Sequence, residues 1–192
     1  MSKQKHVVPC AHCKQAFRKL QKNFWEQKKL AGTDSMTGLP NRRSFTRALN
    51  REFARSRRMD VPISLAVLDL DHFKSINDTY GHSVGDSVLE RLGKLLRNNS
   101  RTSDYVARIG GEEFCIIMPD THIDGASEHL ESLRKKIKEK IRITVDGERL
   151  HITASIGVVE LEDDENSADF YTRADDALYV AKQKGRDMVM VG

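Results

Sequence analysis

Long apolar runs, a secretory signal and internal repeats are all absent from this chain of 192 residues. No apolar run approaches the ~20 residues that a membrane-spanning helix requires. The N-terminus is polar and lysine-rich and lacks the apolar segment of a signal peptide. We therefore expect a cytoplasmic protein with no membrane span in this chain.

Cysteine is also scarce, with only three residues. Cys10 and Cys13 form a C-x-x-C pair with His12 inside it and His6 nearby, a spacing that can bind zinc. No second ligand pair follows at zinc-finger distance, and Lys14 stands where haem attachment needs a histidine. A free-thiol tail, or the stub of a removed upstream domain, is therefore favoured over a zinc site.

Charge is distributed unevenly along the chain. Residues 1–60 hold 15 Lys and Arg against 4 Asp and Glu, whereas residues 61–192 hold 17 against 24. A basic segment can indicate binding to nucleic acid or to an anionic membrane. Here the basic residues recur at helical spacing without interleaved aromatic residues, so we favour a solvated helical face and predict no nucleic-acid partner.

The length and the ordinary composition suit one domain with a short extension. We expect residues 1–32 to form an N-terminal tail and helical stalk, and residues 33–192 to form the domain. The stalk has a narrow apolar seam, which is typical of a dimerising helix, although packing on its own domain is an equal alternative. The seam consists of Phe17, Leu20, Phe24 and Ala31, with Lys28 among them.

Hydrophobic periodicity predicts alternating helices and strands in the domain. Helices are expected from Asn41 onward, over 72–79, from Ser83 onward, over 124–140 and over 167–184. Strands are expected over 63–68, 105–109, 115–118 and 188–191, with a hairpin of 141–145 and 150–159 around Asp146-Gly147. This order predicts an α/β (α+β type) fold with one central mixed sheet, mostly antiparallel and of about five strands, flanked by helices.

Residues 110–114 (GGEEF) form the most informative segment, since they lie between two apolar runs and so predict a hairpin tip. Its two glycines let the backbone approach another molecule closely. Asp69 ends a buried strand, at a place where ligands gather in α/β folds. If Asp69, Glu112 and Glu113 converge, they repel one another unless cations lie between them, and Mg²⁺ favours such oxygen ligands. This arrangement suits two-metal phosphoryl or nucleotidyl transfer.

Basic and polar residues flank these acids along the chain. Lys74, Lys182 and Arg186 can neutralise phosphate groups, although for each residue taken alone surface solubility is the favoured explanation, since both helices are amphipathic. Asn77 and Asp86 lie near glycines and can pair with the edges of guanine. Adenine lacks the donor pair that an aspartate accepts, so such a site prefers guanine.

Five motifs occur in order, and together they make a chance match implausible. They are residues 34–43 (DSMTGLPNRR), 69–74 (DLDHFK), 77–86 (with Asn77, Gly81, Gly85 and Asp86), 108–114 (RIGGEEF) and 177–186 (with Leu178, Lys182 and Arg186). On these residues the chain resembles the GGDEF family, the bacterial diguanylate cyclases, over about residues 33–192. The resemblance implies a domain like the palm of nucleotide cyclases and polymerases, and a homodimer that condenses two GTP into cyclic di-GMP and two pyrophosphates.

The resemblance also implies a role for each matching residue. Asp69, Glu112, Glu113 and the carbonyl of Leu70 bind two Mg²⁺ ions, with Mn²⁺ as an alternative, and one ion activates the 3′-hydroxyl that attacks the partner's α-phosphate. Glu112 is the candidate base, acting directly or through the metal. The implied substrate-binding residues are Asn77, Asp86, Phe73 and Leu89 for guanine, Lys74, Lys182 and Arg186 for phosphates, and Gly110 and Gly111 for the nucleotide.

Arg101 and Asp104 match the product-inhibition motif of the family, an R-x-x-D separated by five residues from the glycines. On residue chemistry alone they indicate a local salt bridge. The family often adds an arginine from the following helix, and that position holds Ser132 here. Arg134 is two residues on, a rotation of about 200°, so we expect feedback inhibition by cyclic di-GMP to be weakened.

Two alternatives compete with an active enzyme. One is a sensor module that binds GTP or cyclic di-GMP without turnover, which the intact acids at 69, 112 and 113 disfavour. The other is a hybrid cyclase that also uses ATP, which Asp86 disfavours. Glu112 replaces the aspartate of the family's name, and both versions occur among active members. The sequence does not identify the input signal, and an upstream sensor domain outside this chain is one possible source of it.

Overall fold

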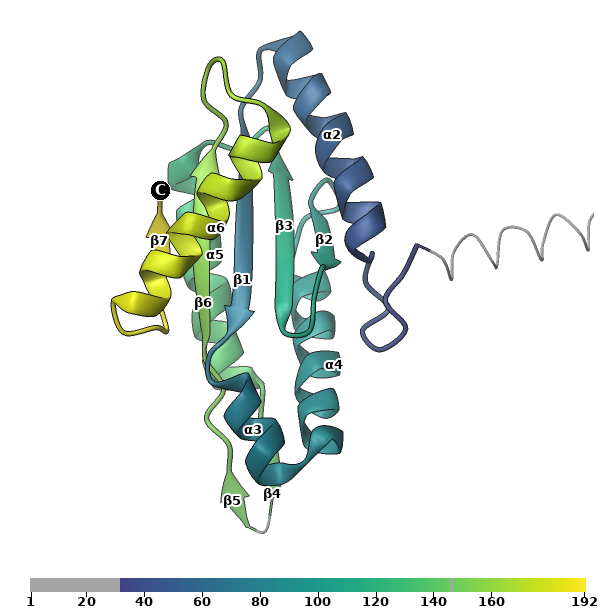
Figure 1. Ribbon diagram of the computed structural model, residues 1–192, viewed down its shortest axis with the longest axis vertical. Helices are drawn as coiled ribbons and strands as arrows, with labels where there is room; N and C mark the ends of the chain where they lie inside the picture. The colour runs from purple at the N-terminus through teal and green to yellow at the C-terminus, as the bar shows by residue number, and fades with distance from the viewer. Residues whose placement is uncertain (1–31, 146) are drawn as a thin grey trace, which may run out of the picture.

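A five-stranded sheet runs through the centre of the protein in the computed structural model, which describes residues 32–145 and 147–192 (Figure 1). Its strand order is β2-β3-β1-β6-β7, and only the β6–β7 pair is parallel. The mixed, mostly antiparallel sheet predicted from the sequence is confirmed. The strands are β1 Ile63–Leu70, β2 Tyr105–Arg108, β3 Glu113–Pro119, β6 Ala154–Glu160 and β7 Val189–Val191.

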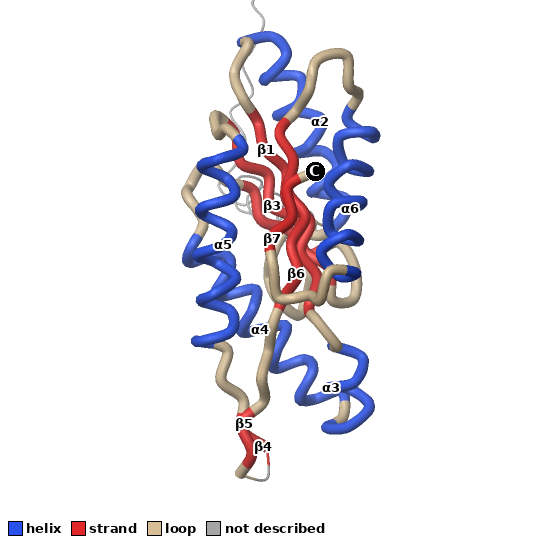
Figure 2. Tube along the Cα trace, turned by 90° about the vertical axis from the view of Figure 1, so that its left-hand side faces the viewer, coloured by secondary structure: helices blue, strands red, loops and turns tan. Residues whose placement is uncertain are grey.

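Helices cover both faces of this sheet (Figure 2). Helices α2 (Arg42–Met59) and α6 (Ser167–Gln183) pack on one face, and α4 (His82–Asn99) and α5 (Ile123–Lys140) pack on the other. The short helix α3 (Phe73–Tyr80) follows β1 at the end of the sheet. No helix in the described part of the chain is long and apolar enough to span a bilayer.

The alternation of side chains along β1 supplies two separate cores. Ile63, Leu65 and Val67 pack under α2 and α6, whereas Ala66 and Leu68 pack under α4 and α5. The whole strand is buried, as its continuous apolar run predicts for a central strand with both faces covered. The same period of two decides which face receives the polar residues at the strand's end.

Asparagines begin the two helices on the α2–α6 face. Asn41 precedes α2 and its side chain accepts a hydrogen bond from the amide of Ser44 at 3.2 Å, which confirms the predicted cap. Asn166 caps α6 by accepting from the amides of Ala168 and Asp169 at 2.9 and 3.0 Å. Each cap satisfies amides that the first turn of a helix leaves unpaired.

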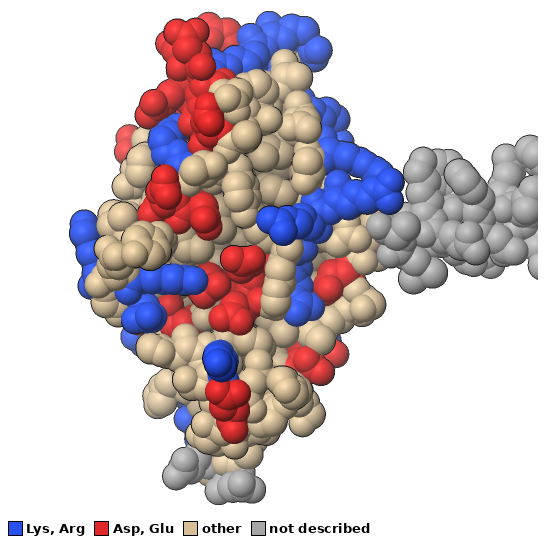
Figure 3. All heavy atoms as spheres, in the orientation of Figure 1, with Lys and Arg blue, Asp and Glu red and all other residues tan. Residues whose placement is uncertain are grey.

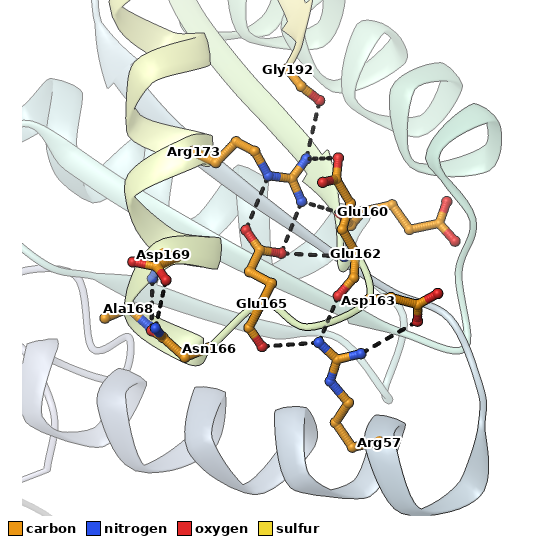
Figure 4. Close-up of polar contacts among 10 residues, drawn as sticks. All are labelled: Arg57, Glu160, Glu162, Asp163, Glu165, Asn166, Ala168, Asp169, Arg173 and Gly192. Carbon is orange, nitrogen blue, oxygen red and sulfur yellow. Dashed lines mark hydrogen bonds and ion pairs between the residues drawn. The ribbon is translucent and has the colours of Figure 1, made fainter.

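Two arginines fix the acidic loop of residues 161–166 between β6 and α6 (Figure 4). Arg57 of α2 donates to the carbonyls of Glu162 and Glu165 at 2.6 and 2.9 Å. Arg173 of α6 pairs with the carboxylates of Glu165 and Glu162 at 3.0 and 3.1 Å. The loop therefore ties the end of α2 to the start of α6.

The predicted strand over 150–159 starts later than expected, because only its residues 154–159 pair in the sheet as part of β6. Residues Glu148–Arg149 form β5 with β4 (Thr144–Val145), and the chain joins β1 only as β6. Residues 150–153 lie outside both strands, since one ladder cannot pair with β4 and β1 at once. The predicted stalk, the pair Cys10 and Cys13, and their neighbouring histidines lie outside the described residues.

Candidate functional site

Three strands bring polar residues together at the end of β1. Asp69 pairs in register with Glu113 of β3 on one side and with Ser155 of β6 on the other. Val67 and Cys115, two positions away from the two acids, belong to the core under α2 and α6. Since side chains alternate along a strand, the two acids share that face, and Asp69 is only 5% exposed.

Lys182 of α6 is the basic partner of this acidic pair. Its Nζ lies 2.9 Å from Oδ1 of Asp69. Burial raises the pKa of Asp69, the ion pair with Lys182 opposes that rise, and the charges of Glu113 and Asp71 add to it. The net result is a raised pKa, which marks a carboxylate held in a crowded, partly desolvated acidic cluster.

Glu112 joins the same electrostatic cluster from the turn before β3. Burial and the charge of Asp69 raise its pKa, Lys182 opposes this, and Glu113 adds to it. Figure 3 shows acidic side chains gathered in the middle of this face, with basic side chains on either side of them. The three acids predicted from the sequence therefore do come within electrostatic reach of one another.

Gly157 of β6 seats helix α6 at the distance that lets Lys182 reach Asp69. A Cβ built on Gly157 would overlap the backbone of α6 at Ala174 and Leu178. Helix and strand thus touch backbone to backbone, and Lys182 stands one turn beyond Leu178. Gly157 was not predicted as a site residue, although an isolated glycine inside a strand pattern indicates such a close contact.

Arg108 holds the turn of residues 109–112 from beneath. It donates to the carbonyls of Gly110 and Gly111 at 3.2 and 2.7 Å, and to Oδ1 of Asp34 at 3.0 Å. The side chain of Arg108 is only 11% exposed. Ile109 closes the hairpin by donating its amide to the carbonyl of Glu113 at 3.0 Å, which confirms the predicted tip.

Asp34 connects this turn to the loop of residues 32–41, which precedes α2. The amide and hydroxyl of Thr37 donate to Asp34 at 2.8 and 2.7 Å. Burial opposes ionisation of Asp34, but the hydrogen bonds from Thr37 and the interaction with Arg108 outweigh it and lower its pKa. Asp34 and Arg108 occur in the motifs quoted above, yet neither was assigned a role, because their pairing across 74 positions is visible only in the fold.

Asp71 shapes the loop that carries Arg186. It is buried and accepts hydrogen bonds from Thr153, Ser155 and the amide of Asp187, at 2.7, 2.6 and 3.0 Å. Arg186 and Asp187 both have positive φ, 65° and 47°, in this loop. The role of Asp71 was not predicted, because these contacts come from residues more than 80 positions away in sequence.

Arg134 supports the same loop, and its ion pairs there keep it from acting together with Arg101. It pairs with Glu131 at 2.6 Å and with Asp187, and Lys138 pairs with Asp187 at 2.6 Å. Glu131 and Asp187 together raise the pKa of Arg134, although burial opposes them. Arg134 therefore does not replace the arginine that the family often has at the position of Ser132.

Helices α3 and α4 bring the predicted guanine residues together. Gly85 of α4 lies against Oδ1 of Asn77 and the ring of Phe73. Phe73 and Leu89 are buried in the core between the helices, while Asp86 is exposed beside Gly85. Within the described residues, the side chains of Lys74, Asp86 and Arg186 have no recorded hydrogen bond or ion pair.

The R-x-x-D segment is held by backbone contacts. The amide of Arg101 donates to Oδ2 of Asp104 at 2.7 Å, and the amide of Asp104 donates to the carbonyl of Arg101 at 3.1 Å. The local salt bridge expected from residue chemistry is absent between these two described residues. The guanidinium of Arg101 is exposed.

The carboxylates at the end of β1 are oxygen ligands of the kind that divalent cations prefer. Carboxylates that raise one another's pKa gain from cations placed between them, and Mg²⁺ takes oxygen ligands. Among residues 32–145 and 147–192, no three His, Cys, Asp or Glu side chains are arranged to hold a metal as they stand. Lys182 instead neutralises Asp69.

Comparison with known proteins decides the family. A family model described as "Diguanylate cyclase, GGDEF domain" matches residues 31–188. The chain belongs to the GGDEF family. Diguanylate cyclase DgcP of Pseudomonas aeruginosa is 43% identical over 166 residues, which are 86% of this chain and 25% of that protein. Diguanylate cyclase DosC of Escherichia coli is 35% identical over 158 residues, which are 82% and 34%.

Solved GGDEF structures share this fold. The coiled coil and GGDEF domain of DgcB from Caulobacter crescentus, in complex with c-di-GMP, has a TM-score of 0.90 and 31% identity, and the match covers 95% of this chain and 96% of that one. The active GGEEF domain of a Vibrio cholerae diguanylate cyclase has a TM-score of 0.73 and 37% identity, covering 79% and 96%. The chain nevertheless spans only a quarter to a third of the length of DgcP and DosC.

Proposed function

We propose that this GGDEF domain is a diguanylate cyclase, which condenses two GTP into cyclic di-GMP and two pyrophosphates. The observation that carries the proposal is the in-register pair of Asp69 and Glu113, with Lys182 beside it and the Gly-Gly turn next to it. The similarity to named diguanylate cyclases supports this reaction.

Magnesium is the proposed cofactor, with two ions in each active site. Asp69, Glu112, Glu113 and the carbonyl of Leu70 are the residues that would hold them. Bound there, the ions supply Lewis-acid stabilisation of phosphate oxygens and activation of a hydroxyl. The raised pKa values of Asp69 and Glu112 support the need for positive charge at this place.

The residues of α6 and its following loop are proposed to hold the triphosphate. Lys182 is the cation of the acidic cluster, and Arg186 lies four residues on, in a loop that Asp71 and Asp187 keep in shape. Their charges would stabilise the β- and γ-phosphates as pyrophosphate leaves. Lys74 and the backbone of Gly110 and Gly111 complete the proposed nucleotide contacts.

Guanine is proposed to bind between α3 and α4. Gly85 of α4 lies against Asn77 and Phe73 of α3, and the next residue, Asp86, has an exposed side chain. Phe73 and Leu89 are buried in the core. A carboxylate accepts the two donors of the guanine edge, and ATP leaves it unpaired. This supports GTP as the substrate over ATP.

The reaction needs two domains that face each other, because each holds one GTP. The 3′-oxygen of one GTP bonds to the α-phosphorus of the other, the bond to the bridging oxygen of the β-phosphate breaks, and pyrophosphate leaves. Glu112 is the proposed base for the hydroxyl proton, acting directly or through the metal. A second transfer of the same kind closes the ring.

Product inhibition is proposed at Arg101 and Asp104. The exposed guanidinium of Arg101 is the group that would bind a phosphate of cyclic di-GMP. Ser132 contributes no second guanidinium from α5, so inhibition through these two residues alone is expected to be weaker than with three.

The proposal is tested by incubating the purified chain with GTP and Mg²⁺ over a range of protein concentrations. Cyclic di-GMP should form, and its specific activity should rise with protein concentration because two domains must meet. Chelation of Mg²⁺ should stop the reaction. No product at high protein concentration would contradict the enzyme and favour a sensor module, and products containing adenine from a GTP–ATP mixture would contradict guanine selection.

A further inference from the structure

A cavity of about 400 Å³ lies between the first halves of α2 and α6, beside the residue that leads into the Gly-Gly turn. Its volume is within the range found for small-molecule sites. None of the residues proposed above to hold GTP or Mg²⁺ lines it. The lining residues that carry the argument are Arg42, Phe45, Leu49, Asn50, Ile109 and Tyr171.

The charge of the cavity favours an anion. Arg42 is the one charged residue among the described residues that line it, and no described carboxylate pairs with this exposed guanidinium. Burial raises the pKa of Tyr171 and the charge of Arg42 opposes that rise, so the guanidinium lies within electrostatic reach of the ring. Asp175 and Glu113 also act on Tyr171, but neither lines the cavity. A single negative charge is therefore what the cavity complements.

The walls of the cavity favour a flat apolar body on that anion. The rings of Phe45 and Tyr171 meet edge to face, with their centroids 6.0 Å apart and their planes at 62°. Phe45 and Leu49 are buried in the core under α2 and α6. A third aromatic ring can pack on this pair in the same geometries. A polyphosphate lacks such a body, and one arginine does not offset its charge.

The polar groups of the cavity favour a carboxylate as the anion. The fork of the Arg42 guanidinium can donate two parallel hydrogen bonds to one carboxylate. Asn50 and Ser167 also line the cavity, and their side chains make no hydrogen bond to another described residue. Donors are therefore in place on both helices.

Ile109 connects the cavity to the Gly-Gly turn. It lines the cavity, and its amide donates to the carbonyl of Glu113 at 3.0 Å across the hairpin. A ligand that packs against Ile109 opposes the opening of this hydrogen bond. Hydrogen exchange of the Ile109 amide should therefore slow when the cavity is filled.

We propose that this cavity binds a small aromatic monocarboxylate, whose carboxylate pairs with Arg42 and whose ring packs against Phe45 and Tyr171. The bound ligand also packs against Ile109 and holds the hairpin of the Gly-Gly turn closed. Binding requires neither GTP nor Mg²⁺, so the proposal goes beyond the proposed function and does not rest on it.

The test titrates the isotope-labelled full chain with phenylacetate and with its uncharged analogue phenylacetamide, and follows the backbone amide resonances. Phenylacetate should give saturable shifts at Thr46, Ile109 and Tyr171 and should slow hydrogen exchange of the Ile109 amide. Phenylacetamide should bind at least about tenfold more weakly, because it lacks the charge that pairs with Arg42. Arg42→Gln should bind both compounds with the weaker affinity, and its amide spectrum shows whether it is folded.

Arg43→Gln is the matched control, because Arg43 is the next arginine of α2, is exposed and does not line the cavity. It should keep the wild-type preference for phenylacetate. Equal affinity of the wild type for the two compounds, or an unchanged preference in Arg42→Gln, would overturn the proposal. So would the absence of saturable shifts at Thr46, Ile109 and Tyr171, the result expected if a second copy or another segment of the chain covers the cavity. A failure of the proposed function shows separately, as absence of synthesis from GTP.

Discussion

Lys182 and Asp69 show how one ion pair can organise an acidic site. The lysine offsets part of the cost of burying Asp69 among Glu113 and Asp71, and it is the cation that α6 delivers to the site. In a partly buried cluster, one missing charge is felt by every remaining carboxylate. The residues of this site therefore act as a unit.

Replacing Lys182 tests whether the acidic site needs its basic residue. Lys182→Ala should lower kcat/KM for GTP by about 10²-fold, the size of effect seen when one preorganised charge is removed from a transition state. Steady-state synthesis of cyclic di-GMP measures it. Lys184→Ala is the control, since Lys184 is exposed just after the same helix, and it should retain activity. Equal losses in the two variants would argue against a specific role for Lys182.

Asp34 and Arg108 form an ion pair, which supports the Gly-Gly turn. Asp34→Asn leaves a mostly buried guanidinium without its carboxylate and should lower the free energy of unfolding by about 2 kcal/mol. For a chain of this size the melting temperature should fall by about 4–8 °C. Thermal unfolding followed by circular dichroism measures the change.

The stabilisation of the folded state by Asp34 should depend on pH in a defined direction. Because the folded-state pKa of Asp34 is lowered, its stabilisation is complete above its ordinary value of 3.8 and is lost as the pH falls through the folded-state pKa. The difference between wild type and Asp34→Asn should stay constant near neutral pH and shrink below pH 3.8. A difference that grows on acidification would contradict the assignment.

At the scale of elements, the site depends on how closely α6 lies on β6. Gly157→Ala places a methyl group into the backbone of α6, so the helix has to move away from the strand. We expect a loss of roughly 1–3 kcal/mol in the free energy of unfolding, as for other overpacked cores, and a loss of activity as Lys182 shifts. Denaturant unfolding and the synthesis assay measure the two effects.

Gly125→Ala in α5 is the control for that substitution. The nearest atom that its new Cβ would meet is Cγ2 of Thr121 at 3.8 Å, an ordinary contact. Alanine also favours the helix over glycine by up to about 1 kcal/mol. Gly125→Ala should therefore match or exceed the wild type in stability, and a similar loss in both variants would remove the special role of Gly157.

At the scale of the whole molecule, local patterns predicted the elements but not their partners. The continuous apolar run over 63–68 predicted a central strand, and Asn41 predicted the start of α2, because each depends on neighbours in sequence. The late start of the expected strand over 150–159, at Ala154, was missed, because it depends on where the pairing with β1 begins.

The same distinction applies to the site. The acids at 69, 112 and 113 were predicted because carboxylates on a turn and at a strand end indicate metal binding by their residue type and local position alone. The supporting roles of Arg108, Asp71 and Gly157 were missed, because each depends on a contact with residues far away in sequence. A sequence read alone therefore finds the groups that do chemistry more readily than those that position them.

In the proposed function, the carboxylate pair of Asp69 and Glu113 is the reaction centre of a diguanylate cyclase. The measurement that tests it most directly is cyclic di-GMP synthesis by Glu113→Ala, at a protein concentration where the wild type is fully active. Glu128→Ala, which removes an exposed glutamate of α5, is the control. We predict no product from Glu113→Ala with its circular dichroism unchanged, and full activity from the control. Wild-type synthesis by a folded Glu113→Ala would contradict it.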